Sequence, residues 1–324
     1  MQKIDEKLER FPRKQVSLLP TPLHYLDNIS QMTGCNIYIK CDDLTGFALS
    51  GNKTRKFDFL IADALQKKCD TILGIGANQS NFCRILSGVG SKYGLGVHLV
   101  LNGKKPDKPT GNLLIDHMLG ATIHHIDTKD SEERMNYALE INEKLKQDGR
   151  NVYFLPPGGS TPVGGLGYAA GFSEIMDDSR KMDLEFDHIF HASSSAGTQA
   201  GLVVGQQISG WKGQIRGISV DVEAHQLRQD VLQLARETGQ LLDIDIDDNL
   251  VHTDDNYIGE GYGVRTEGCQ EAVRLFARKE GIFLDYVYTG KAAAGLLDYC
   301  RSGKIKASEN VLFLHTGGNI ELFE

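Results

Sequence analysis

The hydrophobic positions of this chain follow two spacings that alternate along most of its length. Short runs rich in Val, Ile and Leu are typical of buried strands, and longer segments with apolar residues every three or four positions are typical of helices. The predicted strands are 36–40, 70–73, 97–101, 121–126, 152–155, 188–192, 214–220, 282–284 and 311–315. The predicted helices include or begin at 57–66, 82–89, 113–119, 135–145, 198, 227–234, 267 and 291. This alternation predicts parallel sheets covered by helices, an α/β fold.

Three stretches depart from the alternation. The chain is loop-like through Pro20-Thr21-Pro22, and the polar, acidic stretch 243–256 predicts an excursion from the fold. The sequence Pro156-Pro157-Gly158-Gly159-Ser160-Thr161-Pro162 is the clearest break, and we expect it to return the chain to a second domain. A length of 324 residues makes two domains the natural expectation.

Charge and composition narrow the possible function classes. The net charge is -8 and no long basic run occurs, which argues against a nucleic-acid partner because neutralising phosphates needs clustered Lys and Arg. The cysteines are scattered without a C-x-x-C pair, so we expect neither a metal site nor a disulfide framework, and a reducing cytoplasm fits best. Residues 1–10 lack an apolar signal segment, and no uncharged apolar run is long enough to span a membrane.

The strongest candidate for chemistry is Lys53, in the sequence Ser50-Gly51-Asn52-Lys53-Thr54-Arg55-Lys56. A polar loop gives way here to the apolar spacing of 57–66, so the lysine lies at a predicted helix start and is held in place. A phosphate-binding P-loop needs G-x-x-x-x-G-K-[ST], but Asn52 follows Gly51 and the lysine arrives one residue late. The readings that remain are a lysine that forms an imine with a carbonyl cofactor and an ordinary surface lysine.

The sequence Asp42-Asp43-Leu44-Thr45-Gly46, followed by 51–56, resembles a known family signature. It is similar to the pyridoxal-phosphate (PLP) enzymes grouped as D-cysteine desulfhydrases and 1-aminocyclopropane-1-carboxylate deaminases. The resemblance implies the tryptophan-synthase-β-like fold (fold type II), with two open, twisted, mainly parallel sheets. It also implies that Lys53 carries the cofactor, that Lys56 lies close to it, and that the protein is a homodimer.

With this resemblance, the chain is expected to divide into two discontinuous parts. A small domain of 54–165 would be inserted into a large PLP-binding domain made of 1–53 and 166–324.

The sequence Gly74-Ile75-Gly76-Ala77-Asn78-Gln79-Ser80-Asn81 joins a predicted strand to a helix. Gln79 stands where G-x-G-x-x-G needs its third glycine, so the dinucleotide fingerprint fails. Polar side chains and backbone N–H groups at a helix start can bind a ligand. The pattern is explained equally well if Ser80 or Asn78 simply caps the helix. The stretch 79–81 also resembles the family's Q-S-N motif. That resemblance implies that Asn81 hydrogen-bonds the ring oxygen of the cofactor and that Gln79, Ser80 and Asn81 face the substrate.

A second polar loop, Ala192-Ser193-Ser194-Ser195-Ala196-Gly197-Thr198, follows a predicted strand and opens a helix. Hydroxyls and N–H groups at a helix start can hold a phosphate without a positive side chain, whereas the plainer reading is a Ser-rich loop that caps its helix. The loop resembles the family's phosphate-binding loop. This implies that the cofactor phosphate lies on four consecutive residues, Ser195, Ala196, Gly197 and Thr198.

Two tyrosines, Tyr262 and Tyr288, lie where the family places tyrosines in contact with substrate. A buried tyrosine more often packs its ring and hydrogen-bonds its hydroxyl than takes part in catalysis. Tyr286 and Arg265 stand where the family pattern usually has proline, and both departures lie beside the expected site. Substrate preference is therefore less firmly implied than cofactor binding.

Thr289 bears on which reaction the site would favour. A carboxylate beside the pyridine nitrogen keeps it protonated and makes the ring a strong electron sink, and a threonine hydroxyl cannot compensate that charge. The deaminase branch of the family has glutamate at this position. The desulfhydrase branch has threonine, with a second threonine that matches Thr316. A weaker sink suffices for a good leaving group such as a thiol, whose pKa of about 8.5 is far below that of water.

The resemblance, which spans nearly the whole chain, implies a PLP-dependent β-eliminating lyase that converts D-cysteine to pyruvate, hydrogen sulfide and ammonia. Lys53, Ser80, Tyr262 and Tyr288 are the expected catalytic residues, with Lys53 as the base that takes the Cα proton. The alternatives are 1-aminocyclopropane-1-carboxylate deamination, elimination from another β-substituted amino acid such as cysteate, and an inactive small-molecule binder. No histidine is given a catalytic role.

Overall fold

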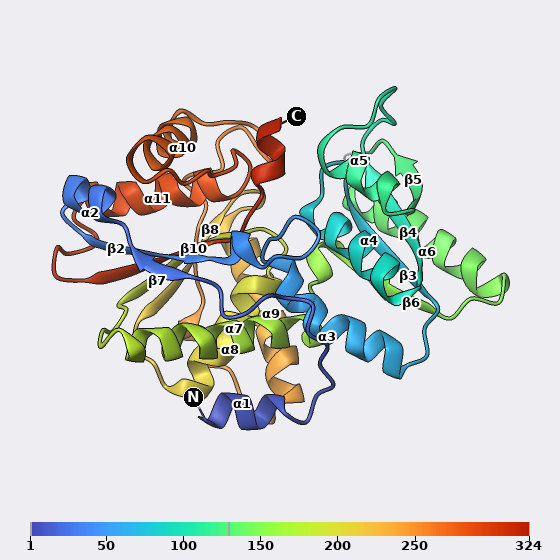
Figure 1. The fold of residues 1–324 in the computed structure, drawn as a ribbon, viewed down its shortest axis with the longest axis horizontal. Helices are drawn as coiled ribbons and strands as arrows, with labels where there is room; N and C mark the ends of the chain where they lie inside the picture. The colour runs from blue at the N-terminus through green and yellow to red at the C-terminus, as the bar shows by residue number, and fades with distance from the viewer. Residues whose placement is uncertain (1, 129, 324) are drawn as a thin grey trace.

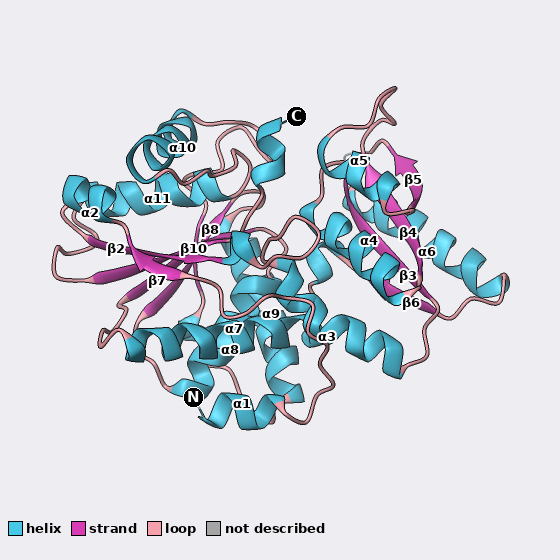
Figure 2. Ribbon diagram, viewed as in Figure 1, coloured by secondary structure: helices cyan, strands magenta, loops and turns pink. Residues whose placement is uncertain are grey.

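The computed structural model describes residues 2–128 and 130–323, which form two sheets with helices on their faces (Figures 1 and 2). The large sheet has the strand order β1-β2-β10-β7-β8-β9. All of its neighbours pair in parallel except β1, which is antiparallel to β2. Its strands are β1 (Leu23–Tyr25), β2 (Asn36–Cys41), β7 (His188–Ser193), β8 (Gln214–Ser219), β9 (His252–Asp254) and β10 (Asn310–His315).

The small sheet is parallel throughout and has the order β5-β4-β3-β6. Its strands are β3 (Thr71–Ala77), β4 (Gly96–Asn102), β5 (Thr122–Ile126) and β6 (Val152–Leu155). All four lie inside the stretch 54–165, and all strands of the large sheet lie outside it. The division at residues 53/54 and 165/166 itself stays a prediction.

The helices cover the sheets in layers (Figure 1). α7, α8 and α9 pack on one face of the large sheet, and α2, α10 and α11 on the other. The helices in the order of the chain are α1 (Gln2–Leu8), α2 (Asp27–Thr33), α3 (Lys53–Gln66), α4 (Asn81–Tyr93), α5 (Gly111–Met118), α6 (Ser131–Gln147), α7 (Pro162–Lys181), α8 (Gly197–Ser209), α9 (Ala224–Leu241), α10 (Glu267–Glu280) and α11 (Thr289–Arg301).

Helix α3 belongs to both cores. Its Phe59 packs in the core under the large sheet, whereas Phe57 and Leu60 pack in the core of the small sheet. Because neighbouring side chains within one turn of a helix point in different directions, one helix can be buried on two sides at once. The helix that begins with Lys53 therefore joins the two halves of the molecule.

Most of the predicted strands and helices are confirmed, but three predictions fail. The stretch up to Pro20-Thr21-Pro22 is not all loop-like, because it contains the helix α1. The run 282–284 is not a strand: Phe283 is 60% exposed, and the carboxylate of Asp285 accepts the backbone N–H groups of Val287 and Tyr288 just beyond it. The acidic stretch 243–256 does not lie wholly outside the fold, because it contains β9, which pairs with β8.

The helix α7 was missed, because the hydrophobic spacing did not reveal it. Glycines at 164, 165, 167 and 171 interrupt its apolar pattern. One of them has a packing reason: a Cβ at Gly167 would lie 2.4 Å from the carbonyl oxygen of Arg55. Close approach of α7 to α3 thus requires a residue without a side chain, at the cost of helix propensity.

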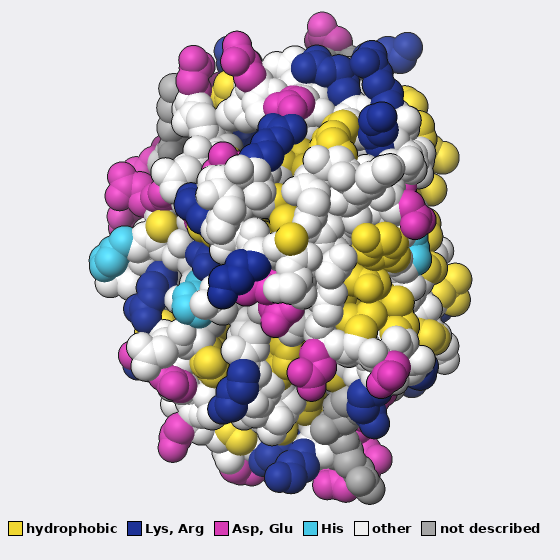
Figure 3. Space-filling view, turned by 90° about the vertical axis from the view of Figure 1, so that its left-hand side faces the viewer, with side chains coloured by type: hydrophobic (Ala, Val, Ile, Leu, Met, Phe, Trp, Pro, Cys, Tyr) yellow, Lys and Arg dark blue, Asp and Glu magenta, His cyan; other side chains and the backbone are white. Residues whose placement is uncertain are grey.

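In Figure 3, Lys and Arg side chains are interspersed with Asp and Glu over the face shown, and they form no continuous basic stripe there. Within residues 2–128 and 130–323, no helix has the length and apolar character needed to cross a membrane.

Candidate active site

Lys53 is the first residue of α3 and lies beside the carboxyl end of β10. The backbone N–H of Asn52 donates to the carbonyl of Thr316, 2.9 Å away, which ties the helix start to the large sheet. Lys53 Nζ donates to Asn52 Oδ1 at 3.0 Å. Burial lowers the pKa of Lys53 to about 8, and the charge of Glu321 opposes this shift. A substantial fraction of the amine is therefore neutral near pH 8, as a nucleophile or base requires.

The loop that leads to Lys53 has an unusual backbone. Three consecutive residues other than glycine, Ala48, Leu49 and Ser50, have φ of 43°, 61° and 65°. Side chains disfavour this region, so the surrounding structure must hold the loop in place. The guanidinium of Arg84 does so by donating to the carbonyls of Ala48 and, at 3.0 Å, Ser50.

The loop 195–198 forms the start of α8, as expected. Ala196 has φ 65° and ψ -35°, and the N–H of Gly197 donates to the carbonyl of Ser195 at 2.7 Å, which makes a strained γ-turn. Thr198 Oγ1 accepts a hydrogen bond from Asn52 Nδ2 at 3.0 Å. Asn52 therefore links the helix start that would bind a phosphate to Lys53.

Lys56 places a buried ammonium at the same helix start. Its Nζ donates to the carbonyl of Gly158 at 3.0 Å and to Ser160 Oγ at 3.4 Å, and a Cβ at Gly197 would lie 2.5 Å from it. Burial lowers its pKa, and across the described residues no carboxylate lies within ion-pair distance of it. A buried cation with only neutral acceptors fits an anion such as a phosphate.

This arrangement adds one group to the expected cradle. The 195–198 loop was expected to hold a phosphate through neutral donors, and the buried amine of Lys56 also lies beside it. The hydroxyls of Ser160 and Ser195, 3.1 Å apart, complete the same cradle. The cradle therefore combines a helix N-terminus, hydroxyls and one ammonium, a donor set that fits the phosphate of PLP.

Thr198→Glu is expected to weaken retention of PLP, because a carboxylate at the cradle would repel the phosphate. The matched control is Thr198→Gln, which has nearly the same size and no charge. Retention is measured from the absorption of the bound chromophore after dialysis, with circular dichroism to confirm the fold. We expect the Glu variant to bind PLP at least about tenfold more weakly than the Gln variant. Equal retention by the two variants would show that the loop has another purpose.

The residues 79–81 form the start of α4. Ser80 Oγ caps the helix by accepting from the N–H of Cys83 at 3.3 Å, which leaves its hydroxyl proton available to a ligand. Gln79 Oε1 accepts from the N–H of Asn112 at 2.8 Å, so this side chain connects α4 to α5. Asn81 Oδ1 accepts from Asn112 Nδ2 at 3.1 Å, and Asn81 Nδ2 donates to Glu321 Oε1 at 3.1 Å.

Tyr262 and Tyr288 come together although they are far apart in the sequence. Their hydroxyls are in hydrogen-bond contact, and their rings meet edge to face with centroids 5.9 Å apart. Burial raises the pKa of both hydroxyls, so both stay protonated. The hydrogen bond between them uses one of the two protons and leaves the other for a ligand.

Asp285 is a site residue that the sequence reasoning passed over. Its Oδ1 accepts from the N–H and the hydroxyl of Thr289 at 2.8 and 2.5 Å, and the N–H of Asp285 donates back to that hydroxyl at 3.0 Å. The single hydroxyl proton of Thr289 is thereby used within the protein. Thr316 Oγ1 has no hydrogen-bond partner in the described part of the chain. Of the hydroxyls of Thr289 and Thr316, that of Thr316 is therefore the one that can donate to a ligand. The sequence signal that could have identified Asp285 is an aspartate four residues before Thr289, at a helix start.

Glu321 is the second residue that was passed over. It is buried, hydrogen-bonds Asn81, and acts electrostatically on Lys53, Tyr262 and Tyr288. Its influence on all three shows that the predicted residues from α3, α4 and the two tyrosine segments converge. A single carboxylate within the apolar sequence Ile320-Glu321-Leu322-Phe323 was the signal for it.

Two histidines end strands near these residues. The ring of His191 is buried with Nδ1 2.9 Å from the carbonyl of Ala192, and burial lowers its pKa to about 4. His315 Nε2 lies 3.0 Å from the carbonyl of Phe283. Both side chains thus bond the backbone.

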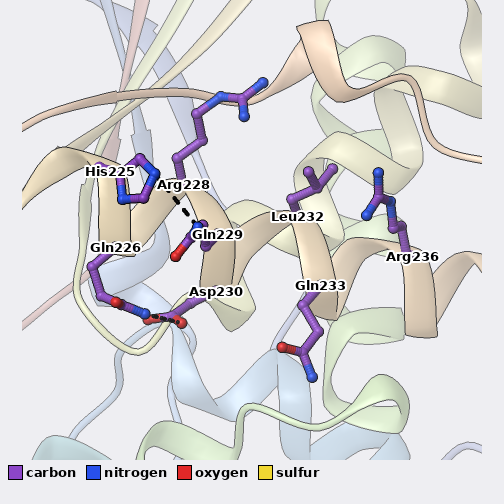
Figure 4. Close-up of a pocket in the computed structure, with 8 residues that line it drawn as sticks. All are labelled: His225, Gln226, Arg228, Gln229, Asp230, Leu232, Gln233 and Arg236. Atoms are coloured by element: carbon purple, nitrogen blue, oxygen red, sulfur yellow. Dashed lines mark hydrogen bonds between the residues drawn. The ribbon is translucent and has the colours of Figure 1, made fainter.

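A separate hollow of about 480 Å³ lies along α9 (Figure 4). Its lining residues all come from that one helix, and the hydrogen bonds drawn between them, such as Gln226 Nε2 to Asp230 Oδ1 at 2.8 Å, run along the helix surface. It contains none of the predicted site residues, so we place the active site at Lys53 and not here.

Comparison with known proteins identifies relatives along nearly the whole chain. The family described as "Pyridoxal-phosphate dependent enzyme" matches residues 15–317. A putative 1-aminocyclopropane-1-carboxylate deaminase of Pyrococcus furiosus is 39% identical over 316 residues, covering 98% of this chain and 94% of that protein. A D-cysteine desulfhydrase of Salmonella typhi is 36% identical over 324 residues, covering 98% and 97%.

The crystal structure of a homologue of 1-aminocyclopropane-1-carboxylate (ACC) deaminase superimposes on this structure with a TM-score of 0.91. The two chains are 40% identical, and the match covers 98% of this chain and 95% of the other. The predicted α/β fold of PLP enzymes of fold type II is thereby confirmed. Sequence, fold and relatives agree that this chain belongs to the pyridoxal-phosphate-dependent enzymes, in the lyase group that contains ACC deaminases and D-cysteine desulfhydrases.

Proposed function

We propose that this lyase eliminates the β-substituent of D-cysteine, which with water yields pyruvate, hydrogen sulfide and ammonia. The observation that carries this choice is the threonine pair beside the expected pyridine nitrogen. Thr289 is held by Asp285, and the backbone of Gly318, two residues after Thr316, also packs against that carboxylate. A hydroxyl from Thr316 can donate to an unprotonated ring nitrogen but cannot balance a pyridinium charge.

PLP supplies an electron sink that stabilises negative charge at Cα of a bound amino acid. We assign the grip on its phosphate to Lys56 and to the 195–198 loop. Lys53 would carry the cofactor and, once the substrate amine has displaced it, Nζ would take the Cα proton. Its lowered pKa, about 8, suits both tasks. Ser80, Tyr262 and Tyr288 would orient the substrate carboxylate and side chain through their hydroxyl groups.

The relatives are named for two activities, D-cysteine desulfhydration and 1-aminocyclopropane-1-carboxylate deamination. The group that has to leave Cβ distinguishes the two reactions. Thiolate is a far better leaving group than hydroxide, because the thiol pKa is about 8.5 against 15.7 for water. A cofactor ring without a pyridinium charge is a strong enough electron sink for the elimination of thiolate. It is too weak a sink for the opening of an unactivated cyclopropane. Relatives bear both names, so deamination of 1-aminocyclopropane-1-carboxylate is the second candidate.

The expected result is a steep dependence on the leaving group. D-cysteine and β-chloro-D-alanine should be processed, D-serine should be slow, and the cyclopropane amino acid should show no turnover. Thr289→Glu alone should lower thiol elimination, because it changes the charge beside the ring and displaces the hydroxyl that Asp285 holds. The values of kcat/KM for each substrate in both proteins test this. Efficient turnover of the cyclopropane amino acid by the parent would move the protein to the deaminase branch.

We further propose that the protein works as a homodimer in the cytoplasm with a small amino acid as its substrate. The scattered, unpaired cysteines support the reducing compartment: all six are free thiols, and all are buried.

A further inference from the structure

The loop of residues 258–265 carries Tyr262 and is rich in glycine. Gly259, Gly261 and Gly263 have φ of 71°, 145° and 77°, a backbone region that side chains rarely adopt. A Cβ at Gly261 or Gly263 would meet nothing within 4 Å, so these two glycines serve the turn of the backbone and not close packing. A loop of this composition has many other conformations open to it, and neighbouring groups must hold it in the one observed.

Both ends of the 258–265 loop are tied to helices of the large domain. The hydroxyl of Tyr257, just before the loop, donates to Asp298 Oδ2 on α11 at 2.7 Å. Just after the loop, Thr266 Oγ1 caps α10 by accepting the N–H of Cys269 at 3.1 Å. These contacts fix where the loop begins and ends, and its middle depends on other contacts.

Lys291 holds the middle of the loop. Its Nζ donates to the carbonyl of Ile258 at 2.7 Å and to that of Gly261 at 2.9 Å, and the residue is buried. Hydrogen bonds from an ammonium group are stronger than those between neutral groups. Because Gly261 directly precedes Tyr262, Lys291 fixes the backbone from which the tyrosine side chain extends.

A cation–π pair holds the last residue of the loop. The guanidinium of Arg265 lies over the ring of Tyr286, with 4.1 Å between Cζ and the ring centroid, which is within the range of about 6 Å for such contacts. Cys269 Sγ donates to the carbonyl of Tyr286 at 3.2 Å and keeps this ring beside the start of α10. Arg265 and Tyr286 both stand where the family pattern usually has proline. A contact between side chains thus restrains the loop where proline would restrain the backbone itself.

Both contacts come from the segment that carries Tyr288. Tyr286 lies two positions before this tyrosine, and Lys291 lies three positions after it. Asp285 Oδ2 fixes the segment by accepting the backbone N–H of Tyr288 at 2.6 Å. The loop is therefore fastened on both sides of Tyr288, whose hydroxyl meets that of Tyr262.

We propose that the amine of Lys291 and the cation–π pair form a clamp on the 258–265 loop, which keeps the hydroxyl of Tyr262 against that of Tyr288. The inference rests on the proposed function, in which both tyrosines orient the substrate. The clamp residues are positioning residues, because they act through Tyr262 and need not touch the substrate. A displacement of about 1 Å at an orienting group can lower the rate about 100-fold, so a small movement of the loop is enough to matter.

Digestion of the holoenzyme with trypsin measures the clamp without any substrate, because Arg265 is an exposed cleavage point inside the loop. The rate of cleavage follows the population of the open loop when opening and closing are fast. Lys291→Met keeps a long side chain and removes both hydrogen bonds, so cleavage after Arg265 should be at least about tenfold faster than in the parent. Fragment masses identify the cleaved bond.

Lys304→Met is the matched control for this digestion. Lys304 is exposed and lies over the ring of Tyr299, with 4.5 Å between Nζ and the ring centroid, away from the loop. Its loss makes the same change of charge and should leave the rate of cleavage after Arg265 within about twofold of the parent.

A double-mutant cycle in kcat/KM for D-cysteine shows whether Lys291 acts through Tyr262. Lys291→Met alone is expected to lower kcat/KM at least about tenfold, with PLP retained. In the Tyr262→Phe background, which already lacks the hydroxyl, the same change should lower kcat/KM by less than about threefold. A residue that only stabilised the fold would lower kcat/KM by the same factor in both backgrounds.

Unchanged cleavage after Arg265 in Lys291→Met, or the same factor in kcat/KM in the two backgrounds, would overturn the proposal. If Lys291→Met does not fold, Tyr286→Leu is used in the same two measurements, because it removes the aromatic face and keeps an apolar side chain. Loss of the cation–π pair should speed cleavage about threefold. Faster cleavage in a protein that does not act on D-cysteine would refute the proposed function and leave the clamp standing. Turnover of D-cysteine with unchanged cleavage would refute the clamp alone.

Discussion

Lys53→Ala is expected to lower kcat/KM for pyruvate release by a factor of at least about 10³, because both the attachment of the cofactor and the base for the Cα proton are lost. Lys56 cannot take its place: its Nζ donates to the carbonyl of Gly158 at 3.0 Å, on the phosphate side of the site. Burial and, second, the charge of Lys53 lower the pKa of Lys56.

The matched control is Lys67→Ala, just beyond the other end of α3. Lys67 pairs with Asp63 at 2.7 Å, and its side chain is 59% exposed, so its loss should change kcat/KM by less than about twofold. Circular dichroism and retention of PLP distinguish a lost base from a lost fold. Activity of Lys53→Ala close to that of the parent would remove the lysine from the mechanism.

Arg55→Met is expected to destabilise the cofactor-free protein by about 3–5 kcal/mol, because it leaves buried carboxylates without their cation. Arg55 Nε and Nη2 each donate to an oxygen of Asp42 at 2.7 Å, and Nη1 and Nη2 donate to Glu174 at 3.0 and 2.9 Å. The hydroxyl of Tyr168 donates to Asp42 at 2.6 Å. The network ties α3, and so Lys53, to the turn that follows β2 and to α7.

Arg236→Met provides the comparison for Arg55→Met. Arg236 pairs with Asp248 at 2.6 Å, but both side chains are about half exposed (53% and 47%), so its loss should cost about 0–1 kcal/mol. The free energies of unfolding are obtained from urea titrations of the two variants and the parent. If Arg55→Met costs no more than Arg236→Met, the buried network does not stabilise the fold.

The network also makes stability depend on pH. Burial alone would raise the pKa of Glu174, but Arg55 and Lys40 outweigh it and lower the pKa to about 2. A carboxyl with a lowered pKa in the folded state stabilises the protein above its unfolded pKa of about 4.3. This contribution is lost as the pH falls from there toward 2.

The elements that the sequence predicted correctly are those whose signal is local. Hydrophobic runs such as 97–101 and 311–315 mark strands because burial on both faces of a parallel sheet needs continuous apolar residues. The helix α7 was missed because Gly167 is required by the backbone of α3, a neighbour more than 100 residues away in the chain. β9 was missed because polar residues are tolerated in a short strand at the edge of a sheet.

The site residues, too, could be predicted only where their sequence signal is local. Lys53 and the 195–198 loop carry their own local signals, a helix start with suitable side chains. The hydrogen bond from Asn52 to Thr198 joins residues 146 apart in the sequence, and that from Asn81 to Glu321 joins residues 240 apart. Only the folded chain brings such partners together, so Asp285 and Glu321 emerged from the structure. The roles assigned to Ser80, Tyr262, Tyr288, Thr289 and Thr316 stay predictions.

The central claim is that Lys53 holds the cofactor, and reduction with borohydride tests it most directly. The holoenzyme is reduced, digested and mapped by mass spectrometry. We predict a yellow protein whose chromophore is lost on reduction, with a pyridoxyl group on the peptide that contains Lys53. A label on Lys56, or no chromophore after reconstitution with PLP, would contradict the account.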